Sequence, residues 1–168
     1  MIFYLVRCSA GSKTKFLLFD HLGECSFSAE ETSGLLTILS LRLSLLNREG
    51  IELLSIRRTA TPTGWRCSAQ RHGSTVIQIR RNTDGTVASI RTREGHWRVS
   101  GDPRTGEYEL LGNGETVLRC SHCQSPQGRE ATKLEIFSRT HPLAALAAAV
   151  MLSDLPILRT PVIALNGQ

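Results

Sequence analysis

Residues 143–152 (LAALAAAVML) form an uninterrupted run of ten apolar residues near the C-terminal end of the chain. Pro142 suits the first turn of a helix, while Asp154 and Pro156 favour a stop, so the pattern predicts a helix over residues 142–153. Such a helix would be about 18 Å long, which is too short for the roughly 30 Å of hydrocarbon in a bilayer. Because it has no polar face, it has to be surrounded by protein.

A helix enclosed on every side limits the architectures that can hold it. A helix with its side chains is about 10–12 Å wide, whereas an eight-stranded barrel is filled by its own side chains. The rest of the chain offers about ten to twelve candidate strands, which is enough for a larger barrel. We therefore predict a mainly β protein, a closed antiparallel barrel of about twelve strands around one central apolar C-terminal helix.

One turn signature recurs between the candidate strands. Residues 20–23 (DHLG), 47–50 (NREG) and 82–85 (NTDG) all place Gly three positions after Asn or Asp. An Asn or Asp side chain opens a turn by bonding its own backbone, and Gly supplies the positive φ that ends it. Such loops join neighbouring antiparallel strands, so the chain is expected to run as a meander. We expect a single domain over residues 1–158 and a tail at residues 159–168.

Alternating or β-branched stretches predict further strands at residues 39–45, 51–58, 97–100, 107–111, 116–120 and 133–137. The first of these stretches also fits a helical spacing. The polar segment 121–130 contains Pro126 and Gly128 and is expected to be a mobile loop.

Trp65 and Trp97 each open a strand and are expected to anchor the core. Aromatic residues make up only 5% of the chain, too few for a platform that stacks bases.

The clearest pair of strands is the hairpin of residues 75–93, which turns at the third of these loops. With that loop, Ile79 is expected to face Ala88, and Ile77 to face Ile90, which makes one side of the hairpin apolar. The opposite side is polar and basic. Its candidate ligand-binding residues are Arg80, Arg91 and, just beyond the strand, Arg93.

The positive charge is concentrated in one part of the sequence. The chain carries a formal net charge of +5, but residues 57–98 hold nine arginines and only two acidic residues. Such asymmetry is typical of proteins that meet an anionic partner. The alternative is codon bias, because arginine outnumbers lysine 17 to 3 in an alanine-rich chain.

Two segments resemble a known family. Residues 52–58 (ELLSIRR), which follow a strand and a turn, and residues 136–156 (IFSRTHPLAALAAAVMLSDLP) are similar to the LURP-one-related and phospholipid-scramblase-like branch of the tubby C-terminal superfamily. The resemblance covers residues 2–158 and implies a hydrophobic C-terminal helix threaded through a closed barrel of about twelve strands. In this superfamily, tubby domains bind phosphoinositide headgroups through basic side chains on the outer face. Their headgroup motif has no residue-by-residue match here, and the acylated and proline-rich segments of eukaryotic scramblases are absent from the sequence.

No catalytic constellation is visible in the sequence. Cys120-Ser121-His122-Cys123 is the one metal-like cluster, but a structural zinc site normally takes four ligands from two such knuckles. We expect Cys120 to be a core residue at a strand end, Cys123 to lie in a loop, and no metal or other cofactor to be bound. The histidines are scattered, and His141 is expected to cap the helix or to lie at its mouth.

These patterns predict a non-catalytic binding module rather than an enzyme. Its basic outer face would recognise anionic phospholipid headgroups or another phosphate ligand; the alternative is a protein-interaction or scaffold domain with an acidic protein partner. Nucleic acid is not expected as a partner because the aromatic content is low. The five cysteines are odd in number and follow no secretory signal, which indicates a reduced, cytoplasmic protein, peripheral at membranes if it binds lipid.

Overall fold

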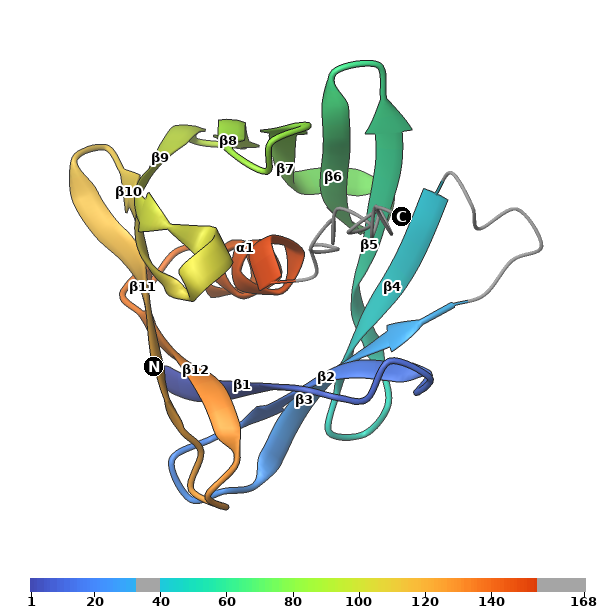
Figure 1. Cartoon of the computed structure of the whole chain (residues 1–168), viewed down its shortest axis with the longest axis vertical. Helices are drawn as coiled ribbons and strands as arrows, with labels where there is room; N and C mark the ends of the chain where they lie inside the picture. Colours follow the sequence, from blue (N-terminus) through green and yellow to red (C-terminus); the bar gives the residue numbers. More distant parts are fainter. Residues whose placement is uncertain (33–39, 154–168) are drawn as a thin grey trace, which may run out of the picture.

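The computed structural model describes residues 1–32 and 40–153 of the 168-residue chain. Twelve strands in these ranges form a closed barrel, in which each strand pairs antiparallel with the next and the first pairs with the last. Figure 1 shows the ring of strands and the helix that follows them in the chain. The prediction of a mainly β, closed antiparallel barrel with one C-terminal helix is confirmed for the described residues.

In chain order the strands are β1 (Ile2–Arg7), β2 (Thr14–Phe19), β3 (Cys25–Glu31), β4 (Ser40–Asn47), β5 (Glu52–Thr61), β6 (Gly64–Arg71), β7 (Ser74–Asn82), β8 (Val87–Thr92), β9 (Gly95–Asp102), β10 (Glu107–Gly112), β11 (Glu115–Gln124) and β12 (Glu130–Ile136). A 3-10 turn, η1 (Pro103–Thr105), joins β9 to β10, and the helix α1 covers Pro142–Ser153, as the sequence predicts. The predicted helix stop at residues 154–156 and the predicted tail at 159–168 lie outside the described residues.

The three recurring turns join neighbouring strands, as predicted. They close the hairpins β2–β3, β4–β5 and β7–β8. In each turn the backbone N–H of the glycine donates to the carbonyl of the opening Asp or Asn at 3.0 Å. The three glycines have φ between 78° and 86°, a conformation that other residues adopt only with strain. These glycines are Gly23, Gly50 and Gly85.

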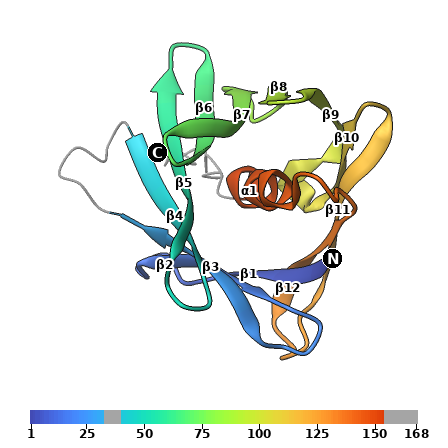
Figure 2. The same cartoon turned by 180° about the vertical axis from the view of Figure 1, so that it is seen from behind.

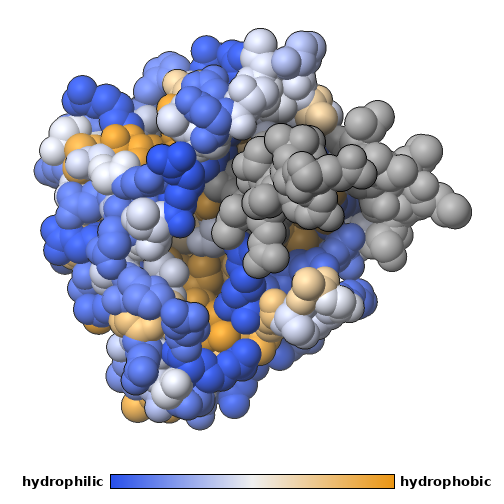
Figure 3. Space-filling view, in the orientation of Figure 1, coloured by the Kyte–Doolittle hydropathy of each residue, from blue (hydrophilic) through white to orange (hydrophobic). Residues whose placement is uncertain are grey.

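The interior of the barrel is lined by alternate residues of the strands. Its largest fully buried side chains are aliphatic or aromatic and include Phe16, Leu18, Leu43, Leu45, Leu54, Ile77, Ile79, Ile90, Leu110, Leu118 and Leu134. Helix α1 packs against β5, β6, β7, β11 and β12, and its residues 144–152 are all buried. Figure 2 shows α1 within the ring from behind, and in Figure 3 hydrophilic residues cover the rim of the barrel while hydrophobic residues lie toward its centre.

The hairpin β7–β8 pairs in a register that differs from the predicted one. The pairs in the structure are Ile79–Ile90, Ile77–Thr92, Arg80–Ser89 and Arg81–Val87. The register shifts between Arg80 and Arg81, so Ala88 is the extra residue of a β-bulge. Ala88 is exposed and does not belong to the apolar face, which corrects the prediction. Arg81 pairs with Val87, so the loop is one residue longer than the predicted loop at 82–85, and the bulge shifts the pairing by one residue more.

The predicted loop at residues 121–130 is mostly strand. Strand β11 runs to Gln124 and β12 begins at Glu130, so the turn covers only residues 125–129. Cys123 accordingly lies in a strand and not in a loop. The polar composition of the segment reflects side chains that face solvent from a paired strand, because backbone pairing does not require apolar side chains.

Candidate functional site

Each of six consecutive strands carries an exposed arginine that directly adjoins a buried residue of the same strand. Successive side chains of a strand point to opposite faces, so these six arginines point outward from the barrel. We call this set the basic face: Arg42 on β4, Arg57 on β5, Arg66 on β6, Arg80 on β7, Arg91 on β8 and Arg98 on β9.

The strand register brings five of these arginines into two rows. In the first row each residue faces the next across neighbouring strands, in the order Arg42, Arg57, Ser68, Gln78, Arg91 and His96. The second row is Ser40, Thr59, Arg66, Arg80 and Ser89. Neither row, as the structure describes it, contains an acidic residue. Two pairs of arginines stand directly opposite each other, an arrangement that destabilises a sheet unless an anion offsets the repulsion.

Elsewhere on the barrel several charges are paired. Ion pairs on or beside β2, β3, β10, β11 and β12 include Lys13–Glu30, Lys15–Glu31, Arg119–Glu109 and Lys133–Glu135, at 2.5–3.3 Å. Within residues 1–32 and 40–153, no arginine of the basic face forms an ion pair, and Arg42 donates only to the Ser55 hydroxyl, at 3.1 Å. A codon bias toward arginine would account for arginine in place of lysine, but not for the lack of acidic residues in these two rows.

A small cavity of about 270 Å³ lies at one edge of the basic face. Arg42, Arg57 and Arg71 contribute to its lining. The one carboxylate in the described lining, Glu52, accepts a hydrogen bond from the Ser44 hydroxyl at 2.5 Å. The basic face is therefore hollowed, rather than flat, beside two of its arginines.

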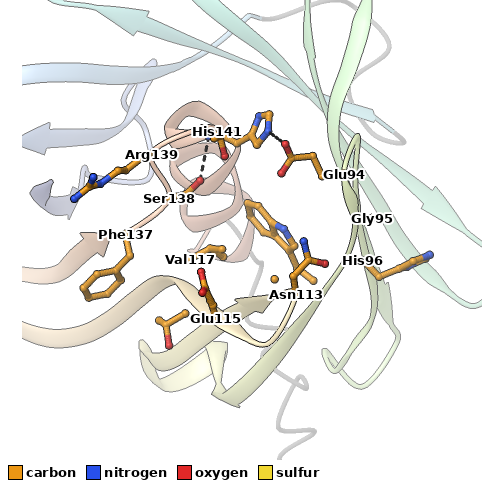
Figure 4. Close-up of a pocket in the computed structure, with 14 residues that line it drawn as sticks. Glu94, Gly95, His96, Asn113, Glu115, Val117, Phe137, Ser138, Arg139 and His141 are labelled. Atoms are coloured by element: carbon orange, nitrogen blue, oxygen red, sulfur yellow. Dashed lines mark hydrogen bonds and ion pairs between the residues drawn. The ribbon is translucent and has the colours of Figure 1, made fainter.

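Two larger cavities, which we call the mouth cavities, open where α1 begins. The larger, of about 670 Å³, is lined by the β6–β7 turn, the β8–β9 turn and the segment that leads into the helix. The smaller, of about 390 Å³, lies over β9 and the β10–β11 turn. The two share Glu94, Arg139, Thr140 and His141. In Figure 4 the imidazole of His141 is turned toward the carboxylate of Glu94, with which it makes an ion pair.

His141 lies at the start of the helix, as predicted. Its backbone N–H donates to the Ser138 hydroxyl at 3.1 Å, and its carbonyl accepts from the N–H of Ala145 at 3.2 Å. Pro142 then occupies the first helical position, where a missing N–H leaves no intrahelical bond unmade.

The structure divides the three arginines predicted as ligand-binding residues. Arg80 and Arg91 lie on the outer face of adjacent strands and belong to the basic face. Arg93 lies in the β8–β9 turn, donates from Nε to the carbonyl of Thr75 at 3.4 Å, and lines the larger mouth cavity. All three are exposed, as expected. The hairpin pattern thus predicted one site for three arginines, whereas the fold places Arg80 and Arg91 on the basic face and Arg93 at the larger mouth cavity.

Several arginines near these sites were not singled out from the sequence. Strand alternation alone would have identified Arg57 and Arg66 as outward-facing, because each lies next to an apolar residue that faces the barrel interior. No local signal places Arg71 and Arg139 at one cavity, since they are far apart in the chain and only the fold brings both to the lining of the larger mouth cavity.

Arg81 points in the opposite direction from Arg80 and is only 3% exposed. Its Nε donates to the carbonyl of Gly85 at 3.0 Å, and its Nη1 donates to the carbonyl of Leu152 at 3.4 Å. Burial lowers the pKa of Arg81 to about 10, so the side chain keeps its charge at neutral pH. A cation at the C-terminal end of a helix is favourable because the last carbonyls carry partial negative charge. We interpret Arg81 as a structural contact to α1.

The cysteines do not form the knuckle that their spacing suggests. Cys120 and Cys123 are three residues apart on β11, so their side chains leave opposite faces of the strand. Cys120 is buried, as predicted, and burial raises the pKa of its thiol to about 12. In the part of the chain that the structure describes, no three metal-ligating side chains come together. Within the same ranges, no helix is long and apolar enough to cross a membrane.

Comparison with known proteins bears on the fold. No protein-family model and no curated protein matches this sequence. Among solved structures, the barrel is similar to the X-ray structure of a protein from Arabidopsis thaliana, with a TM-score of 0.61 and 14% sequence identity. The match covers 91% of this chain and 88% of the other. At this level of identity the likeness shows a shared fold and carries no information about function.

Proposed function

We propose that this protein is a non-catalytic binding module that recognises anionic, phosphate-bearing surfaces, such as phospholipid headgroups, through the basic face. One observation carries the proposal: six consecutive strands each present an outward arginine, and none of the six has an acidic partner among the described residues. The planar guanidinium fork suits phosphate oxygens better than the point charge of lysine does.

The contact we propose is broad and reversible. A flat membrane touches only part of a curved barrel, and Arg66, Arg80 and Arg91 lie on three adjacent strands. Attraction to an anionic membrane is worth about 1 kcal/mol for each basic residue close to it. Three arginines therefore contribute about 3 kcal/mol, and salt screens this attraction beyond about 8 Å at physiological ionic strength. Binding should be weak and salt-sensitive.

We further propose that the chain is a tubby-like protein of the LURP-one-related or scramblase-like branch, with α1 as the central apolar core helix. The burial of residues 144–152 and their packing against five strands support this placement of the helix. In the superfamily that the sequence resembles, the outer face of the barrel is where tubby domains meet phosphoinositides. A cytoplasmic protein, peripheral at the membrane, fits the same proposal.

Co-sedimentation with vesicles tests the function. Wild-type protein should sediment with vesicles that contain phosphatidylserine or a phosphoinositide at low salt, but not with phosphatidylcholine alone. A triple variant of the basic face, Arg66→Gln/Arg80→Gln/Arg91→Gln, should lose most of this binding. The matched control, Arg48→Gln/Arg119→Gln/Arg129→Gln, removes the same charge from exposed sites elsewhere and should retain it. Both variants should keep the wild-type Tm, because exposed substitutions rarely change stability by more than about 0.5 kcal/mol.

Two results would reject lipid recognition by this face. One is equal binding by the basic-face and control variants, which would mean that only net charge matters. The other is no sedimentation of wild-type protein at low salt. In either case the alternative, an acidic protein partner on the same arginines, would become the favoured function.

A further inference from the structure

The smaller mouth cavity is partly walled by a tryptophan. Trp97 on β9 pairs with Gly112 on β10, and Gly112 pairs in turn with Glu115 on β11, so the three residues form one row across the mouth of the barrel. Directly opposed residues share a face of the sheet, and Gly112 continues the inward alternation of Tyr108 and Leu110. The indole and the carboxylate of Glu115 therefore both lie on the inner face, at the cavity.

Gly112 lets the indole of Trp97 lie across β10 on the side of Glu115. A Cβ at position 112 would be 2.8 Å from the indole Nε1 and 2.9 Å from Cδ1, so a side chain there would displace this edge of the ring. Trp97 is 8% exposed, and among the described residues its indole N–H donates no hydrogen bond. A buried Trp N–H usually has an acceptor. The edge of the ring that carries the N–H thus presents a free donor to the cavity.

Two carboxylates line the same cavity from separate segments of the chain. Glu94 comes from the β8–β9 turn and makes the ion pair with His141. The carboxylate of Glu115, at the start of β11, has no hydrogen bond or ion pair in the ranges that the structure describes. Figure 4 shows Arg139 directed away from Glu94 and His141, and His96 belongs to the outward-facing first row of the basic face. The carboxylate of Glu115 is therefore free to meet a cationic ligand.

The remaining groups of the lining favour a ligand with several hydroxyls. The side chains of Asn113 and Thr140 are exposed and, within residues 1–32 and 40–153, form no hydrogen bond, while Val117 supplies a small apolar surface. The volume of about 390 Å³ is within the roughly 300–1,000 Å³ of typical small-molecule sites. A matching ligand needs a cationic group for the carboxylates, an oxygen that accepts from the indole N–H, and further hydroxyls for the amide and the threonine.

We propose that the smaller mouth cavity binds an amino sugar, a compact ring that carries one ammonium group and several hydroxyls. The ammonium group contacts the Glu115 carboxylate, and Glu94 adds a second negative charge that it shares with His141. A hydroxyl oxygen of the sugar accepts from Nε1 of Trp97, and the amide of Asn113 binds a further hydroxyl. The site uses none of the arginines of the basic face and does not depend on phosphate recognition there.

Proton–nitrogen correlation NMR of the indole N–H groups tests the site directly, because the chain has two tryptophans. Titration with D-glucosamine at low salt should shift the indole signal of Trp97. The signal of Trp65, which stands at the start of β6 at the opposite end of the barrel, should not move. Trp97→Phe assigns the two signals, and Trp65→Phe does so if the first variant fails to fold. D-glucose has the same ring without the ammonium group, and cyclohexylamine has the ammonium group without the hydroxyls; both should bind much more weakly.

Substitution of single carboxylates identifies the group that binds the ammonium. Glu115→Gln should weaken glucosamine binding about tenfold, because it removes one charge-assisted contact. The matched control is Glu49→Gln, which removes the same charge from an exposed turn on the opposite side of the ring of strands and should retain the wild-type affinity. Glu94→Gln should weaken binding less than Glu115→Gln, because His141 already offsets the charge of Glu94. The Glu115 and Glu49 variants should keep the wild-type Tm, since both residues are exposed.

Four outcomes would overturn the proposal. The first is an unchanged Trp97 indole signal in the presence of glucosamine at low salt. The second is binding of glucose as tight as that of glucosamine, which would contradict a role for the carboxylates. The third is wild-type affinity in Glu115→Gln. The fourth is binding of cyclohexylamine as tight as that of glucosamine, which would exclude a sugar and indicate the lysine side chain of a partner protein instead.

Discussion

Replacing Ala147 by Asp tests whether α1 is the core around which the barrel closes. Ala147 has no exposed surface and lies in the middle of the helix, within the buried run of residues 144–152. Its neighbours Ala145, Ala148 and Ala149 are equally inaccessible, so the helix offers no polar face to which a carboxylate could turn. The substitution therefore places both extra volume and a charge in the interior.

The size of the effect follows from two terms. A polar group buried without a hydrogen-bond partner destabilises a protein by about 1–3 kcal/mol, and more if it is ionised. Extra atoms in a packed core add about 1–3 kcal/mol. A combined loss of about 2–6 kcal/mol is comparable with the total stability of many domains, about 5–15 kcal/mol. At about 2–4 °C for each kcal/mol in a chain of this length, Tm should fall by about 4–24 °C, or the protein should not fold.

Thermal and urea unfolding, followed by circular dichroism, measure this effect. The matched control is Ala10→Asp, the same substitution at an exposed position between β1 and β2, which should change stability by less than about 0.5 kcal/mol. Burial raises the pKa of the introduced carboxyl, so the folded state binds more protons than the unfolded state and the deficit should grow as pH rises from 4 to 7. An Ala147→Asp protein with the Tm of wild type would refute the central role of the helix.

Two further predictions follow from the alternation of side chains along strands. Arg81→Met should destabilise the protein by about 1–3 kcal/mol because two backbone carbonyls lose their donor, whereas Arg80→Met, one residue earlier and outward, should change stability by less than about 0.5 kcal/mol. Urea unfolding of both variants checks this, and equal effects would contradict the inward position of Arg81. Protein purified without chelator should contain no stoichiometric zinc, because Cys120 and Cys123 leave opposite faces of β11; one zinc per chain by elemental analysis, lost on Cys123→Ser, would contradict it.

The sequence by itself determined the elements whose signals are local. The helix covers the predicted residues 142–153 because the apolar run is ten residues long, is rich in alanine and follows Pro142, all of which favour a helix over a strand. The turns at residues 20–23, 47–50 and 82–85 follow from the side chain that opens each turn and from the glycine that ends it. The period-two pattern of apolar residues likewise predicted where most of the strands lie. The width of a helix indicated how many strands a closed barrel needs in order to surround it.

Only the tertiary structure decided which residues face one another across strands. A loop one residue longer than predicted and a bulge at Ala88 together shift the β7–β8 register, so the predicted partners were wrong for this hairpin. The basic face needs the register of six strands, and the smaller mouth cavity needs Glu94 and Glu115, which belong to different segments of the chain, to line one space. The physical reason is that pairing across a barrel is set by closure of the whole ring, whereas turn and helix signals involve only neighbouring residues.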